Sequence, residues 1–566
     1  MKMRSLVLCA VMAAVAIVIG AAGALRAAPS PAAAVTGQVR SAERPMAGVL
    51  VNVQRFGSNI MTTVVTDTQG RYHFPTANVA PGTYSVSIRA EGWDLVGPAS
   101  VVVRPGSATT ADLKLAPTIN FEDQVSNAEW LSSAPGTLEQ KNMLLNCVDC
   151  HTVQRIFDSY HTAAEWKNFV LPRMSGMYAN NSFWLRPQAF PAGTKRGSGF
   201  PADLPDYLAS INQSTGPRKW PLKTFPRLTG VSAKVIVTTY MLPSKLIQPH
   251  DVIQTADGAV WFDDFGGQNL GKLDAKTGAI TMYRVPANKP NYIMGDLELD
   301  RGANGDLWLA GMFQGQIVAF DPKTATFKQY PVPPATDPNQ TQESMVMPLG
   351  DGVNGIVWTN NQNVHAFEAL DVKAGTWTTY GPYKTPNSDK AFSAYGLLTD
   401  AKNTVWGLDF GGADIGHLVP GADPALTIYQ TPSEHSRPRR GRVDPSTGIL
   451  WFAEYGANGI GEMDTNNPSG GLGTSNPTGG IKEFQMPVPF EAPYDVVADK
   501  NGDVWAGSML TDRVVRLDPK TGRSVQYQLP ADTNIRRVWV DNAKNPVELW
   551  IGNNHQGSII RVQPLD

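Results

Sequence analysis

Seven tryptophans recur through the second half of the 566-residue chain at intervals of 45 to 54 residues. A turn dipeptide stands shortly before several of them, as Asp257-Gly258 does before the first and Asn501-Gly502 before the sixth. A fixed period of this length is typical of β-propellers, in which each repeat forms one four-stranded blade. Seven repeats therefore predict a seven-bladed propeller over residues 231–566. The tryptophans are Trp261, Trp308, Trp358, Trp406, Trp451, Trp505 and Trp550.

The two ends of the repeat array are complementary. Residues 234–243 (Lys-Val-Ile-Val-Thr-Thr-Tyr-Met-Leu-Pro) have the form of a unit's last strand but precede the first unit. The seventh unit ends at Val562 without such a strand. Because an open edge strand invites aggregation, we expect the early strand to complete the last blade and to close the ring.

Two phrases of the repeats carry a resemblance to a known family. One runs from Gly448 to Glu454 (Gly-Ile-Leu-Trp-Phe-Ala-Glu), and the other begins at Gly258 (Gly-Ala-Val-Trp-Phe). Because of these two phrases, the C-terminal half resembles the streptogramin lyase (virginiamycin B lyase) family of seven-bladed propellers. That family uses a His on the innermost strand and a Glu after the Trp as acid/base and Mg²⁺ groups, and eliminates across a cyclic ester. The resemblance therefore implies a lyase with Mg²⁺ as a possible cofactor.

Hairpin geometry indicates where a site could lie. The residue eleven before each Trp and the third after it are expected as cross-strand neighbours on one rim. This pairs His250 with Asp264 and Arg440 with Glu454, which are the four candidate catalytic residues. Polar side chains that converge on a channel mouth are what a ligand site requires. The same reasoning adds further rim residues: Tyr395 with Asp409, Tyr494 with Ser508, and Asp296, Asn361, Arg537 and Asn553.

Arg440 departs from the lyase pattern. Glu454 stands at the family's Glu position, but its expected partner is an arginine, and a guanidinium cannot act as a base near neutral pH. The only His at an innermost-strand position is His250, which could act as a base with Asp264 fixing its tautomer. The arginines around Arg440 could instead hold a carboxylate substrate. An alternative is that these residues only line a water-filled channel.

The stretch Cys147-Val-Asp-Cys150-His151 carries a second kind of chemistry. Two thiols three positions apart can each form a thioether with a haem vinyl group, and the adjacent imidazole can then ligate the iron. A redox disulfide is less consistent with the helical residues before Cys147. A zinc site would need further soft ligands, and the third cysteine, Cys9, lies in the N-terminal apolar segment. The motif predicts one covalent haem c, as in c-type cytochromes.

Residues 118–230 are predicted to form a small helical, cytochrome c-like domain around this motif. Helices are expected over residues 138–146, 162–170 and 204–211. For the sixth iron ligand, Met174 is the first choice, because a thioether opposite His gives a potential suited to electron transfer. Met177 is the second choice and His161 the third.

The N-terminus predicts export. Lys2 and Arg4 precede a long apolar run, and small residues follow, which is the pattern of a signal peptide over residues 1–28. An uncleaved membrane anchor is the alternative interpretation of this run, because about 20 apolar residues can span a bilayer. Residues 34–117 alternate apolar and polar positions between turn signals, and resemble the carboxypeptidase regulatory-like β-sandwich family. The mature protein is expected in the periplasm.

Composition supports a mainly β, multidomain protein, with 53 Gly and 43 Pro in recurrent turns. Lys plus Arg at 48 against Asp plus Glu at 50 gives no basis for nucleic-acid binding. We expect a periplasmic monohaem electron-transfer protein that has a small-molecule ligand at its propeller rim and a redox partner protein. A Mg²⁺-dependent lyase with an accessory haem domain is the alternative, and a non-catalytic binding propeller is the third possibility.

Overall fold

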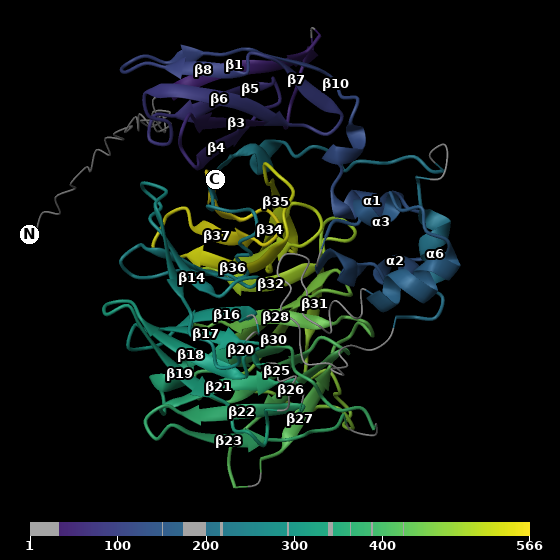
Figure 1. Ribbon diagram of the computed structural model, residues 1–566, viewed down its shortest axis with the longest axis vertical. Helices are drawn as coiled ribbons and strands as arrows, with labels where there is room; N and C mark the ends of the chain where they lie inside the picture. Colours follow the sequence, from purple (N-terminus) through teal and green to yellow (C-terminus); the bar gives the residue numbers. More distant parts are fainter. Residues whose placement is uncertain are drawn as a thin grey trace, which may run out of the picture.

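The computed structural model describes residues 33–566 except 43, 150, 174–199, 215–218, 291, 293, 338–342, 363, 386–388 and 423. The protein is mainly β and multidomain (Figure 1). A β-sandwich lies at one end, a propeller forms the bulk of the molecule, and short helices lie at one side of the propeller. Among the described helices, none is long and apolar enough to cross a membrane. The expected signal segment lies outside the described residues.

The N-terminal sandwich has two sheets. One has the order β2-β1-β10-β7, with β5 and β9 also paired to β1, and the other contains β4-β3-β6-β8. Buried and exposed side chains alternate along the strands of the sandwich. In β6, Tyr84 and Val86 are buried, whereas Ser87 is exposed. The strands are β1 (Ala33–Ser41), β2 (Arg44–Pro45), β3 (Leu50–Arg55), β4 (Ile60–Val65), β5 (Arg71–Pro75), β6 (Gly82–Arg89), β7 (Trp93–Gly97), β8 (Ser100–Val103), β9 (Thr109–Thr110) and β10 (Leu113–Pro117).

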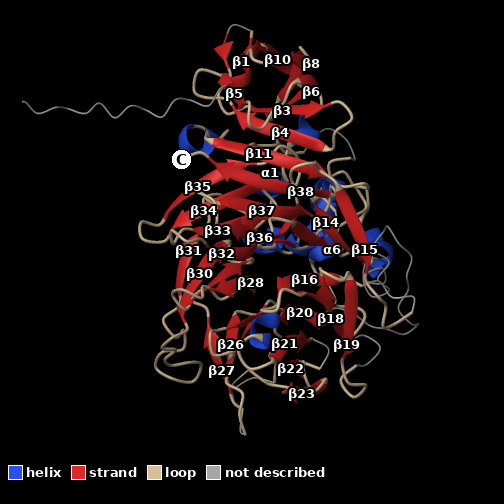
Figure 2. Cartoon of the chain, turned by 90° about the vertical axis from the view of Figure 1, so that its left-hand side faces the viewer, coloured by secondary structure: helices blue, strands red, loops and turns tan. Residues whose placement is uncertain are grey.

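Seven antiparallel four-stranded units form the propeller within the described residues, as predicted. Figure 2 shows the blades around a common centre, with helices α1 and α6 behind them. Blades one to three are β12 (Val252–Gln254), β13 (Val260–Asp263), β14 (Asn269–Leu273), β15 (Ile280–Arg284); β16 (Asp296–Arg301), β17 (Leu307–Gly311), β18 (Gln316–Asp321), β19 (Thr326–Pro331); and β20 (Glu343–Met347), β21 (Ile356–Asn361), β22 (Ala366–Asp371), β23 (Thr376–Tyr380). Blades four to six are β24 (Gly396–Thr399), β25 (Val405–Asp409), β26 (Asp414–Leu418), β27 (Leu426–Gln430); β28 (Pro438–Val443), β29 (Ile449–Glu454), β30 (Gly459–Asp464), β31 (Lys482–Gln485); and β32 (Pro493–Ala498), β33 (Val504–Ser508), β34 (Arg513–Asp518), β35 (Arg523–Gln528).

The seventh blade confirms the predicted closure. It consists of β36 (Ile535–Asp541), β37 (Glu548–Asn553), β38 (Ser558–Pro564) and the early strand β11 (Val235–Met241). Strand β11 pairs with β38 along its whole length, from Val235 opposite Pro564 to Met241 opposite Ser558.

Each repeated Trp packs against an aromatic ring of its blade's outermost strand. Trp308 and Tyr330, for example, stack with ring centroids 5.5 Å apart. In the closing blade the partner of Trp550 is Tyr240, at 5.9 Å, and Tyr240 comes from β11. The early strand therefore restores both the hydrogen bonds and the aromatic pair that the seventh repeat lacks.

Strand β11 also joins the two β domains. Its second edge pairs antiparallel with β4 of the sandwich, from Ile236 opposite Val64 to Tyr240 opposite Ile60. The sandwich sheet and the last blade thus form one continuous eight-stranded sheet (Figure 2). The sandwich covers an edge that would otherwise be exposed.

The segment between sandwich and propeller contains short helices. Three begin with a reciprocal capping box, at Ser126 with Glu129, Thr137 with Gln140, and Thr162 with Glu165. The described helices are η1 (Phe121–Gln124), α1 (Asn127–Ser133), α2 (Leu138–Asn142), η2 (Leu145–Asp149), α3 (Gln154–Phe157), α4 (Ala163–Glu165), η3 (Trp166–Val170), α6 (Leu204–Ile211) and, before β11, η4 (Gly230–Ala233); η5 (Pro348–Asp351) lies in blade three.

Helix is present at all three predicted places in this segment. The first, over residues 138–146, is divided between α2 and η2, whereas α6 (Leu204–Ile211) has the expected bounds. No cytochrome-like helical domain is evident among the segment's described residues. The helices are short, and residues 174–199, which separate the second predicted helix from the third, lie outside the described residues.

The double pairing of β11 predicts that substitutions at the centre of this strand strongly affect the stability of the protein. Thr238 pairs with Arg561 on one side and Thr62 on the other, and its buried hydroxyl has no hydrogen-bond partner among the described residues. We expect Thr238→Pro to cost about 3 kcal/mol or more, because proline removes the backbone donor. Thr238→Val keeps that donor and removes an unsatisfied hydroxyl, so its stability should equal or exceed that of the wild type. Equal denaturant midpoints for the Pro and Val variants would contradict the double ladder.

Candidate functional site

The centre of the propeller is strongly charged and fully buried. Arg440 of β28, Arg537 of β36, Glu298 of β16 and Asp251, which precedes β12, are each at most 1% exposed. They come from four different innermost strands or their approaches. Buried charges at such a place have to be paired.

Arg440 and Asp251 form a bidentate ion pair. Nη1 of Arg440 donates to Oδ1 of Asp251 at 2.7 Å, and Nη2 donates to Oδ2 at 2.8 Å. Nη2 also donates to Glu298. Burial opposes the positive charge, but Asp251 and Glu298 outweigh it and raise the pKa of Arg440 well above its ordinary value. Burial likewise disfavours the Asp251 carboxylate, yet Arg440 holds the pKa of Asp251 well below its usual range.

Arg537 extends the same network. Its Nη1 donates to Oδ2 of Asp251 at 2.9 Å, to Glu298, and to the backbone oxygen of Leu299 at 2.9 Å. Burial raises the pKa of Glu298 to about 7, although both arginines oppose the shift. The network is a set of shared ion pairs in which both oxygens of Asp251 are bonded to guanidinium groups.

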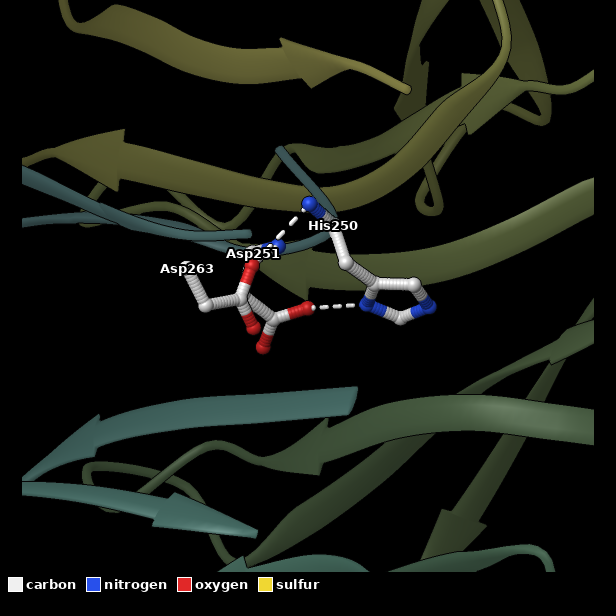
Figure 3. A group of neighbouring side chains, drawn as sticks. All are labelled: His250, Asp251 and Asp263. Carbon is white, nitrogen blue, oxygen red and sulfur yellow. Dashed lines mark hydrogen bonds and ion pairs between the residues drawn. The ribbon is translucent and has the colours of Figure 1, made fainter. Parts of the chain in front are cut away.

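His250 is the neighbour of this network (Figure 3). Its Nδ1 lies 2.8 Å from Oδ1 of Asp251, and its Nε2 lies 2.8 Å from the hydroxyl of Tyr494. The backbone N–H groups of His250 and Asp251 both donate to Oδ1 of Asp263, at 3.0 and 2.7 Å. Two backbone bonds therefore fix the chain at this point, and two side-chain bonds fix the ring.

These contacts define the direction of the hydrogen bonds. Because Asp251 is ionised, it accepts from Nδ1–H of His250, and Nε2 is left as an acceptor. Tyr494 must then donate to His250, and the hydroxyl of Tyr395, which contacts that of Tyr494, donates to Tyr494 in turn. Burial, followed by the arginines, keeps the ring neutral and lowers the pKa of His250 to about 3. The result is an oriented chain from Tyr395 to Asp251.

The carboxyl groups around His250 do not fit a Mg²⁺ site. Ligand atoms of His250, Asp251 and Asp263 lie within 4.8 Å of one another. However, Asp251 is occupied by two guanidinium groups, and a metal would have to displace the His250–Asp251 bond. Burial and then neighbouring acids raise the pKa values of Asp263 and Asp296 well above normal, which disfavours their charged forms.

The side chains of the two expected catalytic pairs bond to other partners, and the expected register of Arg440 with Glu454 is wrong. The ring of His250 bonds to Asp251 and Tyr494, whereas Asp264 accepts from the backbone of Gln248 at 3.0 Å and from Asn269 at 3.2 Å. Arg440 bonds to Asp251 and Glu298, whereas Glu454 lies opposite Pro438 in the strand register. Burial, and then the carboxyl group of Glu483, raise the pKa of Glu454 to about 9.

The strand register of blade five explains the second error. Trp451 lies opposite Arg442, nine residues earlier, whereas Trp261 lies opposite Ile253, eight residues earlier, and a β-bulge between Pro438 and Gly441 shifts the register further. Similar shifts occur at the start of β16, β20, β32 and β36.

The other expected rim residues have varied roles. Arg537, Tyr395 and Tyr494 join the central network, and Asp296 is buried close to Asp264 and Asp251. The remaining expected rim residues make local contacts. Ser508, Asn361 and Asn553 donate to the backbone oxygens of Glu491, Thr336 and Asp532, respectively, and Asp409 accepts from Lys390.

Sequence reasoning missed Asp251 and Glu298. A signal for Asp251 is present, because Pro249-His-Asp-Val and Pro493-Tyr-Asp-Val are the same phrase in two blades. In both, the Asp bonds to the next blade's innermost strand: Asp251 accepts from the Leu299 N–H at 3.1 Å, and Asp495 accepts from the Val538 N–H at 3.3 Å. The repeated Asp therefore ties neighbouring blades together.

The stretch that carries Cys147 lies directly on this rim. The hydroxyl of Tyr455 donates to the backbone oxygen of Leu145 at 2.6 Å, and the amide of Asn534 donates to that of Val148 at 2.9 Å. Cys147 packs against an apolar cluster that contains helix residues as well as Tyr455 and Tyr494. We call the described residues 145–149 and 151 the docked segment.

Within the docked segment, Cys147 and His151 lie one turn apart. The backbone N–H of His151 reaches the oxygen of Cys147 at 3.4 Å, and Nδ1 of His151 lies 2.8 Å from the backbone oxygen of Thr152. Burial lowers the pKa of the His151 ring. Cys150, Met174 and Met177 lie outside the described residues, and the ring of His161 contacts Tyr160 and Trp166.

Comparison with known proteins supports the two β domains. Residues 227–469 match the model of the Virginiamycin B lyase family, and residues 34–116 match that of the carboxypeptidase regulatory-like domain. Both expected resemblances are thereby confirmed, and residues 1–33, 117–226 and 470–566 match neither model. No curated protein matches the chain.

Several solved structures are similar to the chain. A streptogramin B lyase is 21% identical with a TM-score of 0.49, over 59% of this chain and 99% of that one. Virginiamycin B lyase from Staphylococcus aureus is 18% identical with a TM-score of 0.47, over 58% and 99%. YCF48 bound to D1 peptide is 14% identical with a TM-score of 0.42, over 57% and 93%.

The buried imidazole predicts a specific pH dependence of stability. The pKa of His250 is about 3 in the folded protein against an ordinary value of 6.5. The contribution of the neutral ring to the free energy of unfolding is therefore complete above pH 6.5 and is lost as pH falls towards 3. Relative to a His250→Gln variant, the wild type should lose about 1.4 kcal/mol of unfolding free energy per pH unit in that window. Denaturant titrations at several pH values measure this difference. Parallel curves for the two proteins would show that His250 is not held neutral.

Proposed function

We propose that this chain is an exported c-type haem protein that acts in electron transfer, with the propeller as the rigid platform for its haem-bearing segment. The observation that carries the proposal is the docked segment. Tyr455 and Asn534 bond to the backbone on either side of Cys147, and this contact with the propeller supports a haem-bearing segment at the rim over one on a separate, tethered domain. The propeller fold is used by lyases and by binding proteins alike, so the motif is the feature on which we base the electron-transfer proposal.

The residues present fit a haem as far as the structure describes them. Cys147 and Cys150 would supply the thioethers, and His151 would ligate the iron through Nε2. The Nδ1 atom of His151 already faces the Thr152 oxygen at 2.8 Å, which is the contact that fixes a ligand imidazole in its tautomer and orientation. Met174 remains the proposed sixth ligand, with Met177 as the alternative. A haem in this setting supplies one-electron chemistry between ferric and ferrous iron.

A lyase at the same rim is less well supported. The family's reaction needs an accessible base, but His250 is 1% exposed and bonded at both ring nitrogens. Arg440 is committed to Asp251 and Glu298 and is 1% exposed, so it offers no free guanidinium for a substrate carboxylate. The central network is better suited to holding the blades together than to binding Mg²⁺ or a small molecule.

The proposal includes location and partners. The apolar run after Lys2 and Arg4 supports export to the periplasm, where the thioethers would be formed. Because the central network is closed, we propose a redox partner protein as the source or acceptor of electrons, in preference to a small-molecule ligand in the channel.

The haem proposal is tested by spectroscopy of protein exported to the periplasm. We expect pyridine haemochrome analysis to give one covalent haem per chain. Cys147→Ala and Cys150→Ala should each leave a single thioether, seen as a red-shifted haemochrome band, and the double variant should lose covalent haem. Cys9→Ala is the matched control and should leave the spectrum of the mature protein unchanged. Wild-type protein without haem, or a spectrum that both single substitutions leave unaltered, would contradict the proposal.

A further inference from the structure

A groove lies between blade two and blade three of the propeller. Its volume is about 670 Å³, which is within the usual range for a small-molecule site. Blade two lines the groove with Asp306, Trp308 and Lys328, and blade three lines it with Asp351 and Lys373. These residues are distinct from the charged network at the centre of the propeller.

The groove includes a turn of blade two that has a counterpart in blade six. In blade two the backbone N–H of Ala303 donates to Oδ1 of Asp351 at 2.9 Å. In blade six the backbone N–H of Lys500 donates to Oδ1 of Asn542, also at 2.9 Å. Each turn therefore makes the same bond to the next blade, and the two turns differ in their side chains. The sequences are Gly302-Ala-Asn-Gly-Asp306 in blade two and Asp499-Lys-Asn-Gly-Asp503 in blade six.

Two long side chains of blade six are replaced by alanine in blade two. Lys500 reaches across to blade seven, where its Nζ donates to a backbone oxygen at 3.0 Å, and the residue in its place in blade two is Ala303. Arg516 lies opposite the repeated Trp of blade six, with its guanidinium carbon 5.5 Å from the ring centroid. The residue opposite the repeated Trp of blade two is Ala319. Small side chains at these two positions leave the groove unfilled.

The same comparison shows a buried donor at the groove. In blade six, Nε1 of Trp505 donates to Oδ2 of Asp499 at 2.9 Å. In blade two the position of that Asp is Gly302, and Nε1 of Trp308 is buried with no hydrogen-bond partner among the described residues. A Cβ atom at Gly302 would lie 2.8 Å from this nitrogen and 2.5 Å from Oδ2 of Asp351. A buried donor of this kind is unfavourable unless a water or a ligand oxygen reaches it.

The walls of the groove offer both donors and acceptors. Lys328 and Lys373 supply ammonium groups, and Asp306 and Asp351 supply carboxylates, so the charges of these four side chains balance. The third carboxylate that lines the groove, Asp321, accepts from residues of its own turn. A hydroxyl group can accept from an ammonium group and donate to a carboxylate. This combination favours an uncharged ligand that is rich in hydroxyl groups.

We propose that the groove between blades two and three binds an uncharged saccharide. Its hydroxyl groups bond to the lysines and carboxylates of the walls, and its apolar face packs on the aromatic lining, which includes Phe327 and Tyr330. Tyr330 is held there by its stack with Trp308, at 5.5 Å between ring centroids.

The saccharide proposal goes beyond the proposed function and does not depend on it. The turn that lines the groove joins the end of β16 to the start of β17. The docked segment bonds to Asn534, which precedes β36 and therefore lies at the opposite end of an innermost strand. The two sites are thus on opposite faces of the propeller.

Isothermal titration calorimetry of the full-length protein with cellotetraose, maltotetraose and chitotetraose tests the proposal. We expect saturable binding of at least one of these oligosaccharides. Asp351→Asn keeps an oxygen for the Ala303 N–H, as Asn542 does in blade seven, but removes the charge of an acceptor. It should weaken the binding about tenfold. Ala303→Lys introduces the side chain that occupies this space in blade six, and should weaken the binding at least as strongly.

Ala319→Arg and Ala369→Arg form a matched pair. Each alanine lies opposite the repeated Trp of its own blade, but only Ala319 lines the groove. Ala319→Arg should abolish binding, and Ala369→Arg should leave the affinity unchanged. If Ala319→Arg does not fold, Asp351→Asn decides the question.

Three results would overturn the inference. The first is that none of the three oligosaccharides binds to the wild-type protein. The second is an affinity that Ala319→Arg and Asp351→Asn leave unaltered, and the third is an equal loss of binding in Ala369→Arg. None of these results bears on the haem proposal, which is tested by the haemochrome spectrum.

Discussion

The double pairing of β11 is the constraint on which the rest of the structure depends. On one edge it bonds to β38 and closes the propeller, and on the other it bonds to β4 of the sandwich. It also supplies Tyr240, which gives Trp550 the aromatic neighbour that the other blades find in their own fourth strand. A closed ring fixes all seven innermost strands, so the charged side chains at the centre can be held without solvent.

That fixed centre explains the chemistry of the rim. Asp251 bonds to two arginines from two other blades, to the backbone of the next blade and to His250, so four elements meet at one carboxylate. The pKa values are shifted accordingly: against the effect of burial, Arg440 holds the pKa of Asp251 well below its usual range, burial lowers that of His250 to about 3, and burial and then Asp251 raise that of Asp263. The charged groups of the network are bonded to one another and buried, and Tyr455 and Tyr494 belong to the apolar cluster against which Cys147 packs.

The repeat period was sufficient to predict the blades and their closure. The spacing of the tryptophans and the Tyr-Met-Leu-Pro phrase that begins at Tyr240 reflect packing contacts that every blade shares. Residue counting failed for Arg440, since blade five pairs Trp451 with Arg442 and then has a β-bulge before Gly441, and such irregularities leave little trace in one sequence. Asp251 was overlooked because its partners, Arg440 and Leu299, lie in other blades. The motif at Cys147 was recognisable from spacing, but its docking on Tyr455 and Asn534 joins residues more than 300 positions apart.

The central claim is that one haem is attached to the docked segment and lies against the propeller rim. Iron-edge anomalous diffraction from crystals of the exported, full-length protein tests it most directly. The account predicts a single iron peak, ligated by Nε2 of His151 and on the side of the propeller that carries Tyr455 and Asn534. A crystal with no iron, or with iron bound away from His151, would contradict it.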